Sequence, residues 1–151
     1  FNAGTDVRSA TPGTEMYHQI KNADSKRLAG LLYEETRAVL DQFDVGWVAL
    51  NDAGATFRPN REGDDYYGVL RRPTPVLSVL LEFAYLSNPV EEELVSDPAV
   101  QDELANAVLI AVERFLETDD PGSGFIDDPI FRGFGPSGAG RTDGCTDPTL
   151  E

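Results

Sequence analysis

Residues 74–89 read TPVLSVLLEFAYLSNP, and this stretch decides how the chain is expected to fold. Only one polar residue, Ser78, interrupts the apolar run 75–81. A short run of this kind is typical of a strand buried on both faces, as in a parallel sheet. A single carboxylate, Glu82, follows where the strand should end. The Asn-Pro pair at 88–89 then supplies an N-cap and a first-turn proline, so a helix is expected to begin there.

The position of Glu82 makes it a candidate functional residue. In open α/β sheets, ligands bind outside the carboxyl ends of the strands. A carboxylate in such a cleft often has a perturbed pKa and takes part in chemistry. The competing interpretation is that Glu82 emerges into solvent, and position alone does not decide between the two.

Predicted strands and helices alternate along the rest of the chain. Alternating polar and apolar residues predict a strand over 14–18. Apolar residues at helical spacing predict helices over about 25–43 and 98–117. This order predicts an α/β fold, a three-layer sandwich with a mostly parallel sheet flanked by helices. Because so few strands make a small sheet, the N-terminal strands are expected to be missing from this chain.

Shorter segments connect these elements. Residues 45–50 predict a short strand or a packed turn, and 51–65 a polar loop of the length that is usually functional or disordered. Residues 66–70 predict a helical turn or a strand. Glu91 stands three residues after Asn88, which predicts a capping box at the start of the helix.

The composition changes at residue 118. Gly and Pro are frequent in 118–151, acidic residues outnumber basic ones, and no hydrophobic period survives. Such a segment buries too little apolar surface to offset its ordering entropy. The chain is therefore divided into a domain over 1–117 and an acidic, disordered tail over 118–151. The apolar cluster 125–131 could dock on a partner or on the domain itself, but incidental apolar residues are the expected interpretation.

The charge and length of the chain exclude several classes of partner. The net charge is −15 over 151 residues. Nucleic-acid binding needs clustered Lys and Arg, and an anionic membrane surface attracts basic segments, so neither is an expected partner. No apolar run reaches the roughly 18 residues that span a bilayer.

Few residues of this chain can carry metal or nucleophilic chemistry. A catalytic zinc needs about three protein ligands, but the chain holds one histidine, His18, and one cysteine, Cys145. His18 is expected to be a structural or surface residue. The Arg71-Arg72 pair could bind an anionic group, although solvated surface arginines are the simpler interpretation.

Residues 72–89 resemble the signature of zinc-dependent N-acetylmuramoyl-L-alanine amidases, the amidase-3 family. The family pattern is Arg-x-Thr, a hydrophobic strand ending in Glu, a Gly-aromatic pair and Ser-Asn-Pro. Glu82 falls on the catalytic glutamate of the family. Ala84 replaces the usual Gly and Leu77 stands where a Pro is common, and both departures leave Glu82 in place. Weaker similarities extend the match over 1–117, at 1–3, 13–17, 25–29 and Gln101.

The resemblance implies hydrolysis of the amide bond between N-acetylmuramic acid and L-alanine in peptidoglycan by a bacterial, secreted, cell-wall enzyme. It implies one zinc ion with ligands upstream of Phe1, and none in this chain. Glu82 would act as general base and acid, and Arg72 and Asn2 would bind substrate. Peptidoglycan is the expected partner, with a protein partner possible through the tail.

Two other interpretations remain open. The chain could be a non-catalytic amidase-like module that binds wall fragments or regulates a partner. It could also be a plain α/β scaffold with Glu82 on its surface. Since the sequence opens on Phe1 rather than Met, it is expected to be the C-terminal part of a larger catalytic domain.

Overall fold

A small mixed sheet lies at the centre of the computed structural model, which describes residues 7–10, 12–44, 54–72 and 75–129. The described strands are β1 (Glu15–His18), β2 (Ala55–Thr56) and β3 (Val79–Glu82), in the order β2-β1-β3. β2 runs parallel to β1, whereas β3 runs antiparallel to it. The α/β class predicted from the sequence is confirmed, and the sheet is mixed.

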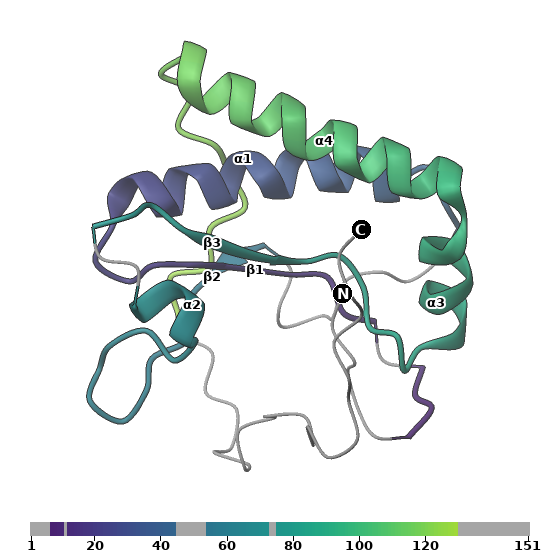
Figure 1. Ribbon diagram of the computed structural model, residues 1–151, viewed down its shortest axis with the longest axis horizontal. Helices are drawn as coiled ribbons and strands as arrows, with labels where there is room; N and C mark the ends of the chain where they lie inside the picture. Colours follow the sequence, from purple (N-terminus) through teal and green to yellow (C-terminus); the bar gives the residue numbers. More distant parts are fainter. Residues whose placement is uncertain (1–6, 11, 45–53, 73–74, 130–151) are drawn as a thin grey trace, which may run out of the picture.

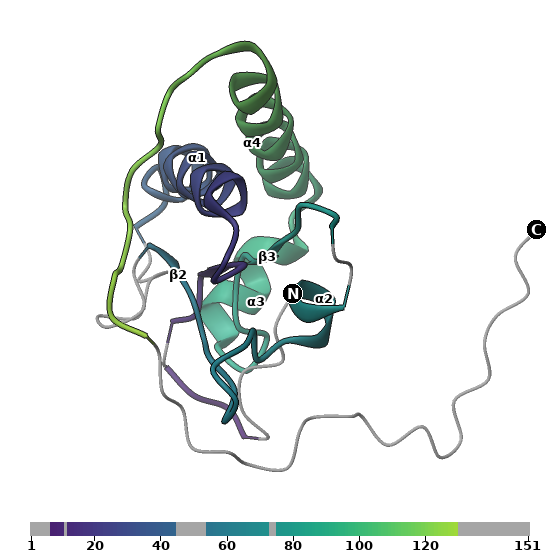
Figure 2. The same cartoon turned by 90° about the vertical axis from the view of Figure 1, so that its left-hand side faces the viewer.

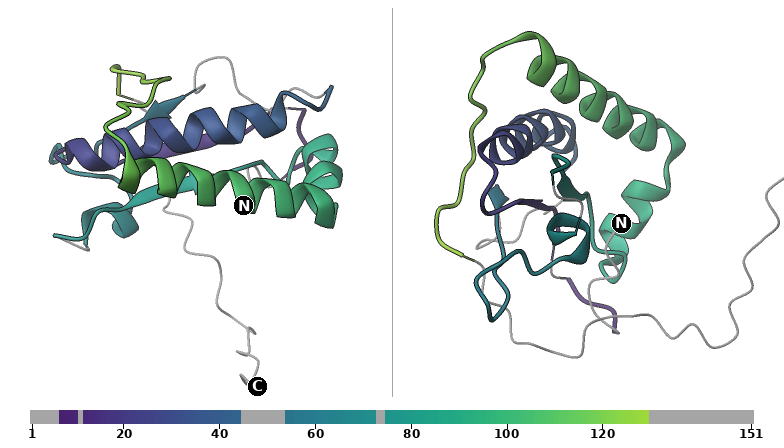
Figure 3. Two further views of the ribbon diagram at one scale, coloured as in Figure 1. Left: turned by 90° about the horizontal axis from the view of Figure 1, so that it is seen from above. Right: turned by 60° about the vertical axis from the view of Figure 1, so that its left-hand side comes forward.

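Two long helices cover one face of this sheet. They are α1 (Ala23–Leu40) and α4 (Pro98–Glu117), which lie side by side (Figure 1; Figure 3). The short helix α2 (Gly68–Arg71) lies on the opposite side of the sheet, and α3 (Pro89–Ser96) lies at one end (Figure 1).

Alternation along the strands builds the core. Met16 on β1 and its neighbours Val79 and Leu81 on β3 face the helices, where they pack with Leu31 and Ala111. Residues one position along, such as Tyr17, point to the other face, because successive side chains in a strand alternate. Glu82 belongs to this second face.

Local capping signals were predicted correctly. The side chain of Asn88 accepts a hydrogen bond from the Val90 N–H, with Pro89 in the first turn of α3. Asp97 caps α4 in the same way, by accepting from the Ala99 N–H. α4 spans the predicted residues, because a cap and an amphipathic period are both local properties.

The prediction of a strand buried on both faces is wrong for β3. The strand begins at Val79, its residues are half-buried, and Val76 before it is 59% exposed. The antiparallel direction has a simple cause. The segment that holds α2 carries the chain past β1 at the end of the sheet where β2 stops, so β3 starts from that same end and runs back along β1.

Residues 118–129, here called the C-terminal strap, pack along the domain instead of leaving it. Figure 2 shows the strap passing α1 to reach β2. The Ala55 N–H donates to the Gly124 carbonyl at 2.8 Å, and the Ile126 N–H donates to the Ala55 carbonyl at 2.9 Å. The Phe125 ring lies so close to Gly30 that a Cβ there would be 2.7 Å from it.

The prediction of a disordered tail from residue 118 is therefore wrong for the strap. Phe125 docks on the domain itself and forms a parallel bridge with Ala55. For residues 130–151, which lie outside the described part, disorder stays a prediction. The predicted segment 45–50 also lies outside it.

Candidate functional site

Glu82 is the last residue of β3, as predicted. The register places it directly opposite Glu15, the first residue of β1. Both side chains lie on the face away from α1 and α4, since directly opposed residues of an antiparallel pair share a face. Glu82 is half-buried, whereas Glu15 is only 1% exposed. Two glutamates therefore lie opposite each other at this end of the sheet.

Tyr17 fixes the position of Glu15. Its hydroxyl donates to Glu15 Oε1 at 3.1 Å, and the tyrosine is completely buried. Its ring also packs against Tyr67, with 4.8 Å between centroids. Glu15 was not predicted as a site residue, although a carboxylate on an alternating strand is an available signal.

A third carboxylate, Glu91, ties the flanking segments together. It is 1% exposed and accepts hydrogen bonds from the Gly13 N–H at 3.0 Å and the Tyr85 N–H at 2.7 Å. Burial raises the pKa of the Glu91 carboxyl, and the two backbone N–H groups oppose part of that shift. The capping-box prediction is wrong, because these N–H groups bind the side chain and the Asn88 N–H donates to the Tyr85 carbonyl instead.

A cavity of about 590 Å³ lies at the opposite end of β1. Polar and charged residues of the β1–α1 connection and of the segment around α2 line it, including Gln19, Lys21, Asp65 and Arg71. Arg71 is occupied there, because its Nη1 donates to the Asp65 and Tyr66 carbonyls. Glu82 is not among the lining residues.

Arg72, another predicted site residue, does not lie beside Glu82. Arg72 is exposed at the end of α2. The side chain of Gln19 donates to the carbonyls of Leu70 in α2 and Val76 before β3, so the end of α2 lies near the start of β3 rather than near Glu82. From Ser78 to Glu82 the strand spans roughly 13 Å. Asn2 lies outside the described residues, so its role stays a prediction.

His18 is a buried residue of β1. It is 4% exposed, and its Nδ1 donates to the Gln19 carbonyl at 3.0 Å in the tautomer that this contact requires. Burial lowers the pKa of the ring, which favours neutral histidine. Its Nε2 has no hydrogen-bond partner among the described residues. These surroundings agree with the expected structural role.

The described part of the chain does not supply a metal site. Within residues 7–10, 12–44, 54–72 and 75–129, no three His, Cys, Asp or Glu side chains gather in a way that could hold a metal ion. In the same ranges, no helix is both long and apolar enough to cross a membrane.

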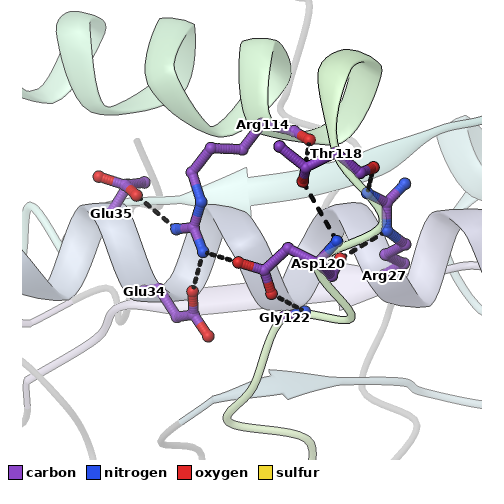
Figure 4. Close-up of polar contacts among 7 residues, drawn as sticks. All are labelled: Arg27, Glu34, Glu35, Arg114, Thr118, Asp120 and Gly122. Carbon is purple, nitrogen blue, oxygen red and sulfur yellow. Dashed lines mark hydrogen bonds and ion pairs between the residues drawn. The ribbon is translucent and has the colours of Figure 1, made fainter.

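A second acidic cluster surrounds Arg114 where α1, α4 and the C-terminal strap meet (Figure 4). The guanidinium group of Arg114 pairs with Glu34 and Glu35 of α1 and with Asp120 of the strap. These contacts raise the pKa of Arg114, with the Asp120 contact the largest cause. One guanidinium group binds three carboxylates from α1 and the strap, so this cluster links α1, α4 and the strap.

Comparison with known proteins identifies similar chains. A family model described as N-acetylmuramoyl-L-alanine amidase matches residues 1–114. N-acetylmuramoyl-L-alanine amidase AmiC of Neisseria meningitidis serogroup B is 29% identical over 86 residues, which cover 56% of this chain and 20% of AmiC.

Solved structures show the same relationship. The CwlD amidase of Clostridioides difficile, solved in complex with the GerS lipoprotein, is 27% identical with a TM-score of 0.57, over 76% of this chain and 51% of that one. An N-acetylmuramoyl-L-alanine amidase from Clostridium difficile 630 shares the fold at 23% identity and a TM-score of 0.57, over 79% and 55% of the two chains. The chain thus spans a fifth of AmiC and about half of each of these structures.

Proposed function

This chain belongs to the N-acetylmuramoyl-L-alanine amidase family, and we propose that it carries part of the active site of a peptidoglycan hydrolase. The bond cleaved would be the amide between N-acetylmuramic acid and the L-alanine of the stem peptide. The observation that supports this most directly is Glu82, a half-buried carboxylate that ends β3 inside the matched residues.

Glu82 is proposed as the general base and then the general acid. A carboxylate oxygen of Glu82 would accept a proton from the attacking water and deliver it to the nitrogen of the departing alanine. Positioned proton transfer of this kind contributes roughly 10²–10⁴-fold to rate. Its position suits this role, because the end of a strand holds Glu82 in place and half-burial leaves part of it open to solvent.

Zinc dependence is a separate part of the proposal. The described residues do not fit a zinc site by themselves, and the ligands are proposed to lie upstream of Phe1, as the family resemblance implies. A bound zinc ion would polarise the scissile carbonyl and lower the pKa of water. Arg72 and Asn2 are proposed to bind substrate, and Arg72 lies about one strand length from Glu82, a distance that an extended glycopeptide can span.

The location and partners follow from the substrate. An enzyme acting on peptidoglycan is expected outside the cell or in the cell wall. CwlD was solved with a lipoprotein, which supports the possibility of a protein partner for this chain too, proposed here to bind through the C-terminal residues.

The test is cleavage of purified muropeptides by the complete gene product. We expect Glu82→Gln to lower kcat by about 10²–10⁴-fold, because the amide cannot accept the proton. Glu93→Gln, which removes an exposed carboxylate from α3, is the matched control and should cleave normally. Undiminished cleavage by Glu82→Gln would show that Glu82 is not catalytic.

A non-catalytic module that binds wall fragments is the second candidate. It is favoured by the lack of a metal-holding group among the described residues. Binding of muropeptides without cleavage by the wild-type gene product, in zinc-containing buffer, would support this candidate over the enzyme.

A further inference from the structure

Arg58 is a half-buried cation that the proposed proton transfer does not use. It lies two residues after β2, in the loop that leads to α2. The chain carries a net charge of −15, so carboxylates are far more abundant than basic groups. Yet within the part of the chain that the structure describes, no Asp or Glu side chain forms an ion pair with Arg58.

Two tyrosines hold the guanidinium group of Arg58 in place. Its Cζ lies over the Tyr66 ring, 3.7 Å from the ring centroid, and its Nη1 donates to the Tyr67 hydroxyl at 3.4 Å. Stacking on an aromatic ring stabilises a cation and limits its movement. Among the described residues, Nε and Nη2 of Arg58 have no hydrogen-bond acceptor. These donors belong to a planar group whose shape matches a carboxylate.

The loop that carries Arg58 is held in one shape by its own hydrogen bonds. The Tyr66 N–H donates to the Arg58 carbonyl at 2.8 Å, and Arg71 Nη1 donates to the Tyr66 carbonyl at 2.9 Å. At the loop tip, Asn60 Oδ1 accepts from the Asp64 N–H at 3.0 Å. The guanidinium and its two tyrosines are therefore positioned before any ligand arrives, which lowers the entropic cost of binding.

The aspartates of this loop bind other groups. Asp64 pairs with Lys21 at 2.6 Å, and Asp65 Oδ1 accepts from the Ile20 N–H at 2.9 Å. Both partners belong to the connection between β1 and α1, so these carboxylates anchor the loop to that connection and do not neutralise Arg58. The positive charge is left available to an anionic group from outside.

Arg58 lies on the same side of the sheet as Glu82. Its Cζ is 5.7 Å from the ring centroid of Tyr67, which packs on Tyr17 with 4.8 Å between centroids. Tyr17 shares the face away from α1 and α4 with Glu15, which lies opposite Glu82. Because the two strand residues from Glu15 to Tyr17 span roughly 7 Å, Arg58 is on the order of 15 Å from Glu82.

We propose that Arg58 binds a carboxylate of the stem peptide. This inference rests on the proposed function, since it names the part of the substrate that is recognised beside the proposed reaction centre. The cleaved amide uses the carboxyl group of N-acetylmuramic acid, so in the intact substrate the free carboxylates lie on the peptide side. An extended peptide covers the distance from Glu82 to Arg58 in about four or five residues.

The test measures binding rather than cleavage. Isothermal titration calorimetry compares a free stem pentapeptide with the same peptide carrying carboxamides in place of its carboxylates, on the complete gene product. Amidation should weaken binding to wild type by about tenfold to a hundredfold, because it removes a charge-assisted contact. Arg58→Met should weaken binding of the free peptide by a similar factor and should bind the amidated peptide as wild type does, as a double-mutant cycle requires.

Two further variants serve as comparisons. Arg37→Met removes an exposed arginine of α1 and should bind both peptides as wild type does. Arg58→Lys keeps the charge without the planar fork and should bind the free peptide with intermediate affinity.

Thermal melting of each variant separates packing from binding. If Arg58→Met melts at a lower temperature but still prefers the free peptide as strongly as wild type does, Arg58 only packs on the tyrosines and the inference is overturned. If wild type itself binds the free peptide no more tightly than the amidated one, the inference is overturned without any variant.

Cleavage assays distinguish this inference from the proposed function. If Glu82→Gln cleaves muropeptides as well as wild type does, the catalytic role fails, whereas the binding results for Arg58 still stand. If cleavage depends on Glu82, we expect Arg58→Met to raise KM about tenfold with kcat nearly unchanged, because the carboxylate is bound equally in the ground and transition states. An unchanged KM in that case would overturn the role of Arg58 alone.

Discussion

Glu91 lies buried where β1 and β3 meet, whereas Glu34, Glu35 and Asp120 surround Arg114 on a partly exposed surface. Glu91 binds two backbone N–H groups, and burial raises its pKa. Asp120 pairs with Arg114 and also accepts from the Gly122 N–H, and its pKa is lowered, with the Gly122 hydrogen bond the largest cause.

The difference separates two uses of a carboxylate. Around Arg114 each charge has an opposite charge beside it, so the cluster joins the strap to the helices. Glu91 is instead buried among backbone groups, and that burial raises its pKa. Burial therefore distinguishes Glu91 from the acids around Arg114, which are paired with a cation.

Removing the Glu91 side chain is the strongest way to break this comparison. Glu91→Ala leaves the buried Gly13 and Tyr85 N–H groups without their acceptor, and each such loss costs about 1–3 kcal/mol. We expect the free energy of unfolding to fall by about 3 kcal/mol, measured by urea denaturation at neutral pH.

Glu93→Ala is the control, because that residue is exposed on the same helix. A loss for Glu91→Ala no larger than that of the control would show that Glu91 is not a structural link between the two strand ends.

Replacing Arg114 should have a smaller effect. Arg114→Met keeps the aliphatic stem but removes all three ion pairs, and we expect a loss of about 1 kcal/mol that shrinks in high salt. Amide hydrogen exchange should become faster at Ala55, whose N–H donates to the strap. It should also become faster at Ile126, a strap residue whose N–H donates to Ala55.

The control for Arg114 is Lys21→Met, which breaks an exposed pair with Asp64 and should leave both measurements unchanged. If the amide of Ala55 exchanged as slowly in Arg114→Met as in wild type, the ion pairs would not be what holds the strap in place.

Local signals in the sequence predicted the helices well. The cap residues Asn88 and Asp97 mark the starts of α3 and α4, because a cap depends only on its near neighbours. The end of β3 at Glu82 was also predicted, since an apolar run and its end are visible in one short stretch.

Contacts between distant residues were not predictable in this way. Gly13 and Glu91 are 78 positions apart, and nothing near either one indicates that they meet. The direction of β3 likewise depends on where α2 places the chain. Glu15 was missed because its significance comes from the register with Glu82 rather than from its own surroundings.

The strap shows how composition can mislead. Glycine richness predicted disorder, but Gly124 has a φ of +74° and lies so close to Tyr33 that a Cβ would be 2.2 Å from the ring. There glycine permits both a left-handed turn and close packing. Composition counts the glycines but does not distinguish a flexible segment from one that fits tightly.

Lowering the pH should change the stability contributions of Glu91 and of the strap aspartates in opposite directions. This is the smallest of the expected effects. The folded pKa of Glu91 lies above its ordinary 4.5, so folding takes up a proton between these values and the Glu91 contribution to stability rises as pH falls through that window. Asp120 and Asp127 have pKa values below 3.8, so their stabilisation is present above that value and is lost as pH falls below it.

Urea denaturation midpoints measured from pH 8 to pH 3 give both dependences of stability on pH. Glu91→Gln should reduce the rise in stability on mild acidification, because the group that takes up the proton is gone. Asp127→Asn, which removes the strap's pair with Lys26, should leave that rise intact and weaken only the loss at the acid end. If Glu91→Gln kept the wild-type dependence of stability on pH above pH 4.5, Glu91 would titrate normally, and burial would no longer distinguish it from the acids around Arg114.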